Sequence, residues 1–390
     1  MQNILDYIDW RGDISFETDG FNEVDNLIFS VLSYLEFDNI VPKGIEYSIS
    51  LSKAAELYKK TADKIPSVDH NKLLRRVPEL LEKAAGSGRY SDVYLSCYEK
   101  QTDYEQSEQF SAVIFSIDKN LHFIAFRGTD DTIIGWQEDF HMSFMDEVQA
   151  QKQAVLYVNK NCSKLSGEFY FGGHSKGGNL AVYAAVHSVE SIQERIIGVF
   201  NNDGPGFLDN IVQSEEYQKI INKITTFVPK SSVIGMLLEH QEEYRVVSSD
   251  ETGIMQHDAF SWEVKGIQFV YEDGLAKNSL ILNNTLRAWL SRISLNEREQ
   301  FVNAIFYIIE ATGAKTIGEL TKEKLNAADA MIKTYKNTDD LTKQHIKKVI
   351  EMFFVEGQKN LRCTINDDFE HILEKGKTIT QSIVADLKKQ

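Results

Sequence analysis

The sequence predicts an α/β fold: a mostly parallel sheet covered by helices, with further helices at both ends of the chain. Between positions 110 and 230, strand-like apolar runs alternate with helical stretches, which is typical of parallel strands joined by crossover helices. One run, EFYFGG, leads directly into a serine between glycines and then into a helical stretch. On both sides of this region, apolar residues recur at helical spacing.

The N-terminal region, residues 1–87, is predicted to be a helical segment packed on the core. From Val24 to Leu35 apolar residues recur at helical spacing, and LSKAAELYKKTADKI has a helical composition. Beyond Gly86 the pattern changes. The runs QFSAVIFSI and LHFIAFRG, on either side of the polar DKN, predict two strands joined by a short turn.

The α/β core is predicted to span residues 88–275. After the hairpin, the expected order is a helix near Val148–Lys164, the strand EFYFGG, a helix over Gly178–Val189, the strand RIIGVFN, a further helix and the strand KITTFV. Such an order places helices on the faces of a parallel sheet.

The remaining residues, 276–390, are predicted to form a helical C-terminal subdomain. One helix is expected over Leu280–Leu290, and the capping-box spacing of Ser294 and Glu297 begins another that ends with Gly313 as its C-cap. Two apolar stripes follow at helical spacing: Phe301, Ala304, Ile305, Ile308 and Ile309, and then Ile346, Val349, Ile350, Phe353 and Phe354. We expect both stripes to pack against the protein's own core rather than on a membrane.

The composition restricts the classes of partner and cofactor. Asp and Glu number 58 against 42 Lys and Arg, so the net charge of −16 disfavours nucleic acid and anionic membrane surfaces. The opening MQNILDYIDW lacks a secretory pattern and no run has the length of a transmembrane helix, so a cytoplasmic location is expected. The scattered Cys97, Cys162 and Cys363 predict structural thiols, and no spacing predicts a metal or cofactor site.

Ser175 is the predicted nucleophile. It lies at the centre of a GxSxG motif that begins at Gly173 and ends at Gly177. The motif is weak alone, but a strand precedes it and the apolar helix NLAVYAAV follows it, as a nucleophile elbow requires. The alternative is that Ser175 is only a turn residue in a glycine-rich connection, which needs neither the strand before it nor the apolar helix after it.

An oxyanion hole needs N–H donors, one after the nucleophile and one after an earlier strand. The amide of Lys176 is the first candidate. Thr129, at the end of the strand LHFIAFRG, is the second, and its hydroxyl is expected to assist. The Lys176 side chain is expected either to attract an acidic substrate or lower a neighbouring pKa, or else to lie in solvent at the sheet edge.

These motifs resemble those of the fungal-type (class 3) lipases of the α/β-hydrolase fold. The residues that carry the likeness are AFRGT, then Trp136 with Asp139, then GHSKGG, within positions 110–265. A wider set, including WRGDISF, NNDGPGF and QHDAFSW, resembles more closely a bacterial group of uncharacterised lipase-like hydrolases. The resemblance implies the α/β-hydrolase fold but no particular substrate.

The base is expected after the serine, because the triad of this fold runs Ser, acid, His along the chain. The histidines after Ser175 are His187, His240, His257, His345 and His371. His187 is expected at the far end of a helix, and His345 and His371 fall in the helical tail. His257, in the loop between YRVV and WEV, is the predicted base, with His240 as the alternative. His174 precedes the turn and is expected only to pack against the strand.

The acid is predicted at Asp203, where the strand RIIGVFN ends. The lipase pattern has its acid one strand later, where this chain has Ser231 and Ser232 instead. An aspartate in D-G-P-G can also cap its own turn. The remaining candidates are Glu239, Asp250 and Asp258.

The sequence therefore predicts a serine hydrolase that cleaves a carboxylic ester or thioester of a small acyl or lipid-like substrate through an acyl-enzyme. The terminal helices are expected to cover the site, which favours an acyl substrate over a polymer. Two alternatives stay open: a catalytically impaired scaffold that binds a lipid or a protein, and an amidase or peptidase on the same fold.

Overall fold

The structure is a computed structural model that describes residues 2–62, 72–103, 108–130, 132–316, 319–320 and 324–362. Within these ranges its centre is an eight-stranded sheet whose strands lie side by side in chain order. The strands are β1 (Ile49–Ser50), β2 (Tyr94–Asp103), β3 (Glu108–Ser116), β4 (Leu121–Phe126), β5 (Glu168–His174), β6 (Ile196–Asn202), β7 (Ile224–Pro229) and β8 (Tyr244–Val247). A separate pair follows, β9 (Val264–Lys265) with β10 (Gln268–Phe269).

The direction of pairing changes at β4. Strands β1 to β4 pair antiparallel, whereas β4 to β8 pair parallel. The hairpin of β3 and β4 is the one predicted on either side of DKN. Helices connect β4 to β5, β5 to β6 and β6 to β7, so the predicted α/β class with a mostly parallel sheet is confirmed.

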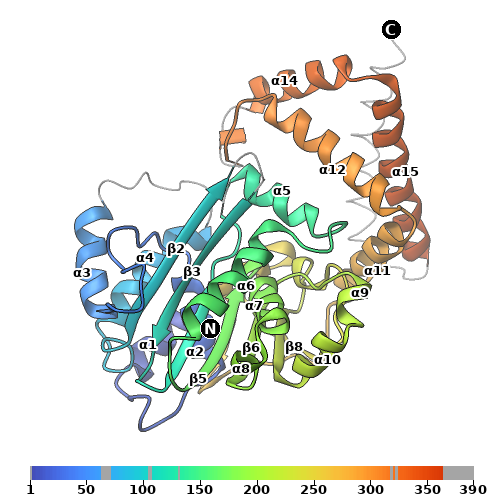
Figure 1. Ribbon diagram of the computed structural model, residues 1–390. Helices are drawn as coiled ribbons and strands as arrows, with labels where there is room; N and C mark the ends of the chain where they lie inside the picture. Colours follow the sequence, from blue (N-terminus) through green and yellow to red (C-terminus); the bar gives the residue numbers. More distant parts are fainter. Residues whose placement is uncertain are drawn as a thin grey trace.

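Helices cover both faces of the sheet (Figure 1). On one side lie α1 (Ile4–Arg11), α2 (Glu23–Leu32), α3 (Leu51–Ala62) and α4 (Lys72–Ala85). On the other side lie α6 (Gln149–Cys162), α7 (Lys176–His187), α8 (Glu190–Gln193), α9 (Asp209–Val212) and α10 (Glu215–Ile220). Successive residues of β3 alternate between these two layers: Val113 and Phe115 pack with the N-terminal helices, and Ala112 and Ile114 with α6 and α7. The sheet is therefore buried on both faces.

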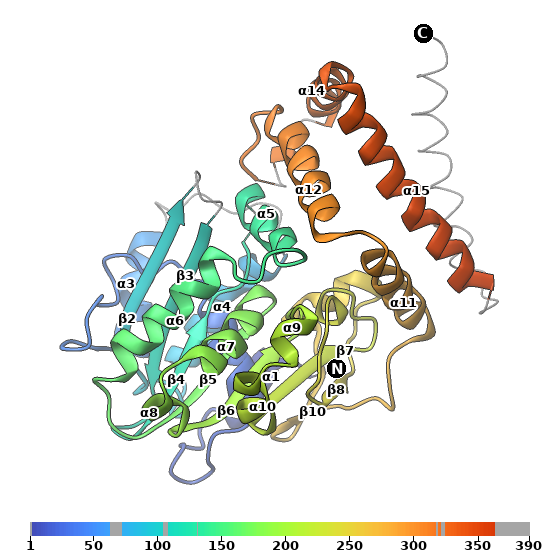
Figure 2. The same ribbon diagram turned by 45° about the vertical axis from the view of Figure 1, so that its right-hand side comes forward.

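The C-terminal helices gather beyond one end of the sheet, next to α5 (Ile133–His141), as Figure 2 shows. They are α11 (Lys277–Ser291), α12 (Leu295–Glu310), α14 (Lys324–Asn337) and α15 (Asp340–Arg362). One side of α12 packs on α15, through Ala304 and Ile308 against Ile346. Another side packs on α5, through Val302 and Phe306 against Ile133. The helix α12 thus joins the C-terminal helices to the rest of the molecule.

The capping box of Ser294 and Glu297 begins α12 as predicted. The end of this helix was predicted wrongly, because its C-cap is Ala311. Two further turns, from the amides of Thr312 and Gly313 to carbonyls of the last helical residues, separate the cap from Gly313, which has a φ of 74°.

Cys97 and Cys162 are buried free thiols, while Cys363 and His371 lie outside the described residues. None of the helices within the described ranges is both long and apolar enough to cross a membrane. The N-terminal helices share one apolar core with the sheet, and α11 begins after β10. We therefore propose the division of the chain into residues 1–87, 88–275 and 276–390.

Candidate active site

Ser175 occupies a strained turn between β5 and α7. Its backbone has φ 58° and ψ −133°, a conformation that residues with a side chain rarely adopt. The two outer residues of the motif must be glycines, because other backbone atoms lie too close to leave room for a side chain. A Cβ at Gly173 would lie 2.2 Å from the Gly177 carbonyl carbon, and one at Gly177 would lie 2.1 Å from the Phe126 carbonyl oxygen. The strand–turn–helix of a nucleophile elbow is therefore present.

The loop that follows β4 lies against this turn. A Cβ at Gly128 would lie 2.4 Å from the carbonyl oxygen of His174, so only glycine allows the loop to come so close. The next amide, that of Thr129, has no hydrogen-bond partner within the described ranges. The amide of Lys176, at the first position of α7, has no partner inside its own helix. These are the two N–H groups expected at an oxyanion hole.

The hydroxyl of Thr129 was expected to assist the oxyanion hole, but in the structure it bonds to another side chain. It donates to Asp139 Oδ2 across 2.6 Å. Because a hydroxyl has one proton, this bond leaves the amide of Thr129, and not its hydroxyl, as the group of this residue that can donate at the turn. Burial raises the pKa of Asp139 to about 6, although the nearby Lys176 ammonium and the Thr129 hydroxyl act in the opposite direction.

The expectation that the Lys176 side chain lies in solvent was wrong, because it is 1% exposed. The alternative that it lowers a neighbouring pKa agrees with its effect on Asp139, where it acts against burial. Lys176 Nζ lies 2.8 Å from Glu138 Oε2 and donates to the Gln109 carbonyl oxygen across 3.0 Å. Glu138 also accepts from the backbone amides of Gln109 and Ala150. This buried pair ties the start of α7 to α5 and β3.

Glu138 was missed by sequence reasoning. The available signal was a lysine at the start of an otherwise apolar helix, because a buried ammonium requires a buried partner of opposite charge. Glu138 is adjacent in sequence to Asp139, in the run WQEDF.

His257 and Asp203 lie together although 54 residues separate them. His257 Nδ1 is 2.6 Å from Asp203 Oδ2. Asp203 is fully buried, and its other oxygen accepts from the Ser232 hydroxyl and from the amide of Gly235. The serine that stands at the usual lipase position of the acid thus supports an aspartate that comes from the end of β6.

Asp203 does not cap its own turn. The side chain of Asn201 does so instead, accepting the amide hydrogen of Gly204 across 2.9 Å. The φ of Asp203 is 54°, a left-handed conformation that aspartate tolerates better than most residues. This conformation accompanies the pairing of its carboxylate with His257.

The alternative candidates have other contacts. His240 Nδ1 lies 2.9 Å from Glu242 Oε1, and Glu239 forms an ion pair with Arg287. Asp258 accepts the amide hydrogen of Phe260, and the backbone amide of Asp250 bonds to Ser261. His187 lies at the last position of α7, as expected.

His174, the residue before Ser175, has a larger role than strand packing. Its Nε2 lies 2.8 Å from the carbonyl oxygen of His257, and its Nδ1 lies 3.0 Å from the hydroxyl of Tyr34. Burial lowers the pKa of His174 well below its usual range, so the ring is neutral. We assign the hydrogen to Nε2, since a carbonyl oxygen only accepts. The His257 loop is thereby fastened to the turn that holds Ser175.

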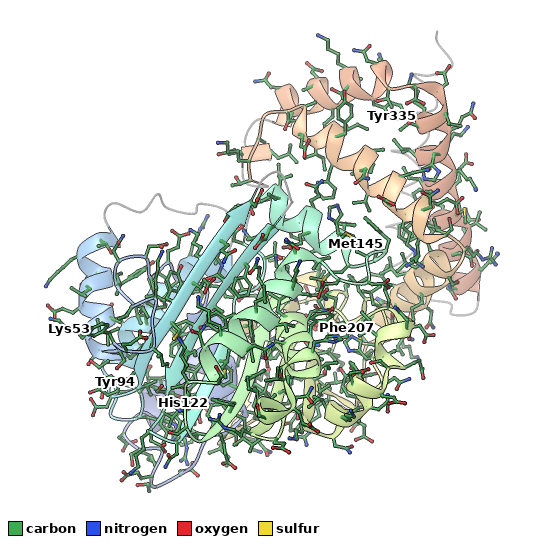
Figure 3. The ribbon with its side chains drawn as sticks, viewed as in Figure 1. Lys53, Tyr94, His122, Met145, Phe207 and Tyr335 are labelled. Atoms are coloured by element: carbon green, nitrogen blue, oxygen red, sulfur yellow. The ribbon has the colours of Figure 1, made fainter. Side chains whose placement is uncertain are left out.

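The proposed catalytic residues, and Ser232 beside them, each follow the carboxyl end of a strand. Thr129 comes after β4, Ser175 after β5, Asp203 after β6, Ser232 after β7 and His257 after β8. In Figure 3, His122 marks the opposite end of the sheet, near the start of β4. Ligand sites of parallel sheets form at the carboxyl edge.

A cavity of 270 Å³ extends from Ser175 toward the C-terminal helices. Apolar side chains from α5, α11, α12 and the segment after β7 form most of its wall: Trp136, Phe140, Val233, Ile234, Leu237, Leu238, Leu286, Trp289, Leu290, Phe301 and Val302. Within the described part of the chain, no group of three or more His, Cys, Asp and Glu side chains is placed to hold a metal ion.

Residues 84–307 match the family described as Mbeg1-like. This range is more than half of the chain. The chain belongs to the Mbeg1-like family. The range of the Mbeg1-like match includes Ser175, Asp203 and His257, and it ends within α12, before α14 and α15.

The other comparisons add little. The comparison with curated proteins found no match. Among solved structures, the crystal structure of M37 lipase is similar over 54% of this chain and 68% of that chain, at 13% identity and a TM-score of 0.32. We draw no conclusion from a likeness this weak.

Proposed function

We propose that this Mbeg1-like protein is a serine hydrolase that cleaves a carboxylic ester or thioester through an acyl-enzyme. The observation that carries the proposal is the 2.6 Å contact between His257 Nδ1 and buried Asp203. The carboxylate holds the ring so that Nε2 is the nitrogen that accepts a proton. Membership in the Mbeg1-like family supports a lipase-like hydrolase.

The proposed reaction begins when Ser175 Oγ attacks the carbonyl carbon while His257 Nε2 takes its proton. Asp203 stabilises the imidazolium that forms. The amides of Thr129 and Lys176 donate to the oxyanion, and the imidazolium then protonates the leaving group. Water then attacks the acyl carbon while His257 Nε2 takes its proton, and the bond from that carbon to Ser175 Oγ breaks. The imidazolium returns the proton to Ser175 Oγ, and the carboxylic acid leaves.

The wall of the cavity supports an ester or thioester over a peptide. A peptide needs partners for its backbone N–H and C=O groups, whereas most of the side chains beside Ser175 are aliphatic or aromatic. The position of Asp203 supports an active enzyme over a catalytically impaired scaffold. No acid directly follows β7, but Asp203 at the end of β6 contacts His257 in its place and accepts from Ser232, the serine after β7.

A fluorophosphonate probe tests this proposal, since it reacts only with an activated serine. We expect the natural protein to be labelled and to hydrolyse p-nitrophenyl acetate, and the Ser175→Ala variant to do neither. Ser163→Ala is the matched control, because Ser163 is exposed at the end of α6, and it is expected to react like the natural protein. The proposal fails if the natural protein resists labelling while a known esterase reacts alongside it.

A further inference from the structure

The cavity beside Ser175 is polar at one end only. Ser175, Lys176 and Asp139 contribute to its wall at the proposed site of reaction. The other polar wall residues, Ser143 and Arg298, already have partners. Ser143 Oγ donates to the Phe140 carbonyl, and the Arg298 guanidinium donates to the carbonyls of Ser143, Leu290 and Ile293. An occupant of the far end therefore meets hydrocarbon surface.

A second apolar cavity, of 160 Å³, continues along the seam between α5 and α12. Four side chains line both cavities: Trp136, Phe140, Phe301 and Val302. The wall of the second cavity is completed by Ile133, Ile305, Phe306 and Ile309. The two cavities are thus neighbours, and Phe301 and Val302 of α12 lie at their junction.

We propose that the first cavity binds the acyl chain of the substrate, and that Phe301 and Val302 set the chain length. This proposal rests on the proposed function, since the ester carbonyl must lie at Ser175. A straight acyl chain fits the arrangement because it is polar only at its carbonyl end. An apolar wall favours such a ligand, because the hydrocarbon chain leaves water when it packs there.

The volume gives the expected length of the acyl chain. An apolar protein cavity of about 150 Å³ binds benzene, which has six carbons, so by the same measure 270 Å³ accommodates roughly ten carbons. The best substrate is therefore an ester of an acid with roughly eight to ten carbons. Each methylene group added below that length is expected to raise kcat/KM about fourfold, the equivalent of its transfer from water.

The residues proposed to select the length of the acyl chain belong to the C-terminal helices. Arg298 of α12 bonds to the Ser143 carbonyl in the segment after α5, and Phe140 of α5 packs edge to face on Phe306 of α12, with ring centres 5.7 Å apart. Val349 of α15 also lines the first cavity, although α15 lies outside the range of the family match. Chain-length selection is therefore a property of residues beyond the core strands.

The test is a series of p-nitrophenyl esters from acetate to palmitate. We expect kcat/KM of the natural protein to rise to a maximum at the octanoate or decanoate and then to fall at least tenfold by the palmitate. Phe301→Ala should join the two cavities and move the maximum to longer chains, and Val302→Trp should move it to shorter ones. Tyr307→Ala is the matched control on α12, because Tyr307 is 62% exposed, and its profile should match that of the natural protein.

Two results would overturn the proposal: a profile that is flat or falls from the acetate onward, or a maximum that stays in place in Phe301→Ala. Phe301→Ala keeps the test decisive if Val302→Trp does not fold. Activity on the acetate and labelling of Ser175 report the proposed function separately, because neither requires the cavity. A failed chain-length profile with intact labelling would thus reject the acyl site alone.

A binding measurement on Ser175→Ala needs no turnover. Trp136 and Trp289 both line the first cavity, so 1-decanol should cause a saturable change in tryptophan emission, and 1-butanol should bind at least tenfold more weakly. Equal responses to the two alcohols would contradict the proposal. Saturable binding of decanol without any labelling of the natural protein would instead reject the proposed function and keep the apolar site.

Discussion

The ring of His174 donates its Nε2 hydrogen to the carbonyl oxygen of His257 across 2.8 Å. The residue before the proposed nucleophile therefore fixes the backbone of the proposed base. Tyr34, from the N-terminal segment, completes the contact by donating its hydroxyl to His174 Nδ1. The distance between Ser175 and His257 thus depends on a side chain that lies 140 residues before His174.

We expect Tyr34→Phe to lower kcat of ester hydrolysis by about three- to tenfold with little change in KM. The loss of the hydroxyl leaves His174 Nδ1 without its donor, which also lowers the free energy of unfolding by about 1–2 kcal/mol. Steady-state kinetics and urea unfolding measure the two effects. The exposed Tyr47 gives the control, Tyr47→Phe, which should change neither. A rise in KM with kcat unchanged would argue against a positioning role.

Asp203→Asn is expected to lower kcat by about 10³- to 10⁴-fold while the protein stays folded, because the amide keeps the shape but does not stabilise an imidazolium. Glu239→Gln and Asp258→Asn should retain kcat within about threefold of the natural protein. Circular dichroism checks the fold of each variant. A comparable loss in Glu239→Gln or Asp258→Asn would assign the acid elsewhere.

The carboxyl of Asp139 predicts a pH dependence of stability. Its folded-state pKa is raised to about 6, so the folded state holds the proton more tightly than the unfolded chain does. The stability that protonation provides is complete below about pH 4 and is lost as the pH rises to about 6. Asp139→Asn, which still accepts from Thr129, should therefore gain free energy of unfolding relative to the natural protein over this interval.

The size of that gain is up to about 3 kcal/mol. Urea unfolding of both proteins at pH 4, 5, 6 and 7 measures it, because titrations elsewhere cancel in the difference. The difference is expected to grow to about pH 6 and then to level off. A difference that is constant from pH 4 to pH 7 would show that the carboxyl has an ordinary pKa.

Lys176→Met should lower the free energy of unfolding by about 3–5 kcal/mol, because it leaves the buried Glu138 carboxylate without its counter-charge. The double variant with Glu138→Gln should recover a large part of this loss, since a neutral amide needs no ammonium. Urea titrations of the natural protein, the two single variants and the double variant form a complete double-mutant cycle. If the loss of unfolding free energy in the double variant equals the sum of the losses in the two single variants, the pair does not interact.

Much of the fold was predictable because it is encoded in local patterns. The alternation of apolar runs predicted the order of β3 to β7, and the sequence from EFYFGG to NLAVYAAV predicted the turn at Ser175. The order of motifs pointed to His257 and Asp203, which the structure places 2.6 Å apart. Their catalytic roles are our proposal.

The features that the sequence did not predict depend on contacts between distant positions. No local pattern links Lys176 to Glu138, or Tyr34 to His174, because each pair meets only after the sheet has formed. The apolar stripe at Phe301 was expected to be buried, yet periodicity does not tell a packed face from the wall of a cavity. The position of Gly313 was misjudged for a simpler reason, since two extra turns follow α12.

Two hydrogen bonds in series link the C-terminal helices to the proposed acid. Ser279 of α11 donates its hydroxyl to the carbonyl oxygen of Ser232, whose own hydroxyl donates to Asp203. The proposed cover of the site and the proposed reaction centre are therefore not independent modules. Exchanging the C-terminal helices for those of another protein, in order to accept a different acyl group, would also alter the support of Asp203, unless the new segment again presents a hydroxyl at the position of Ser279.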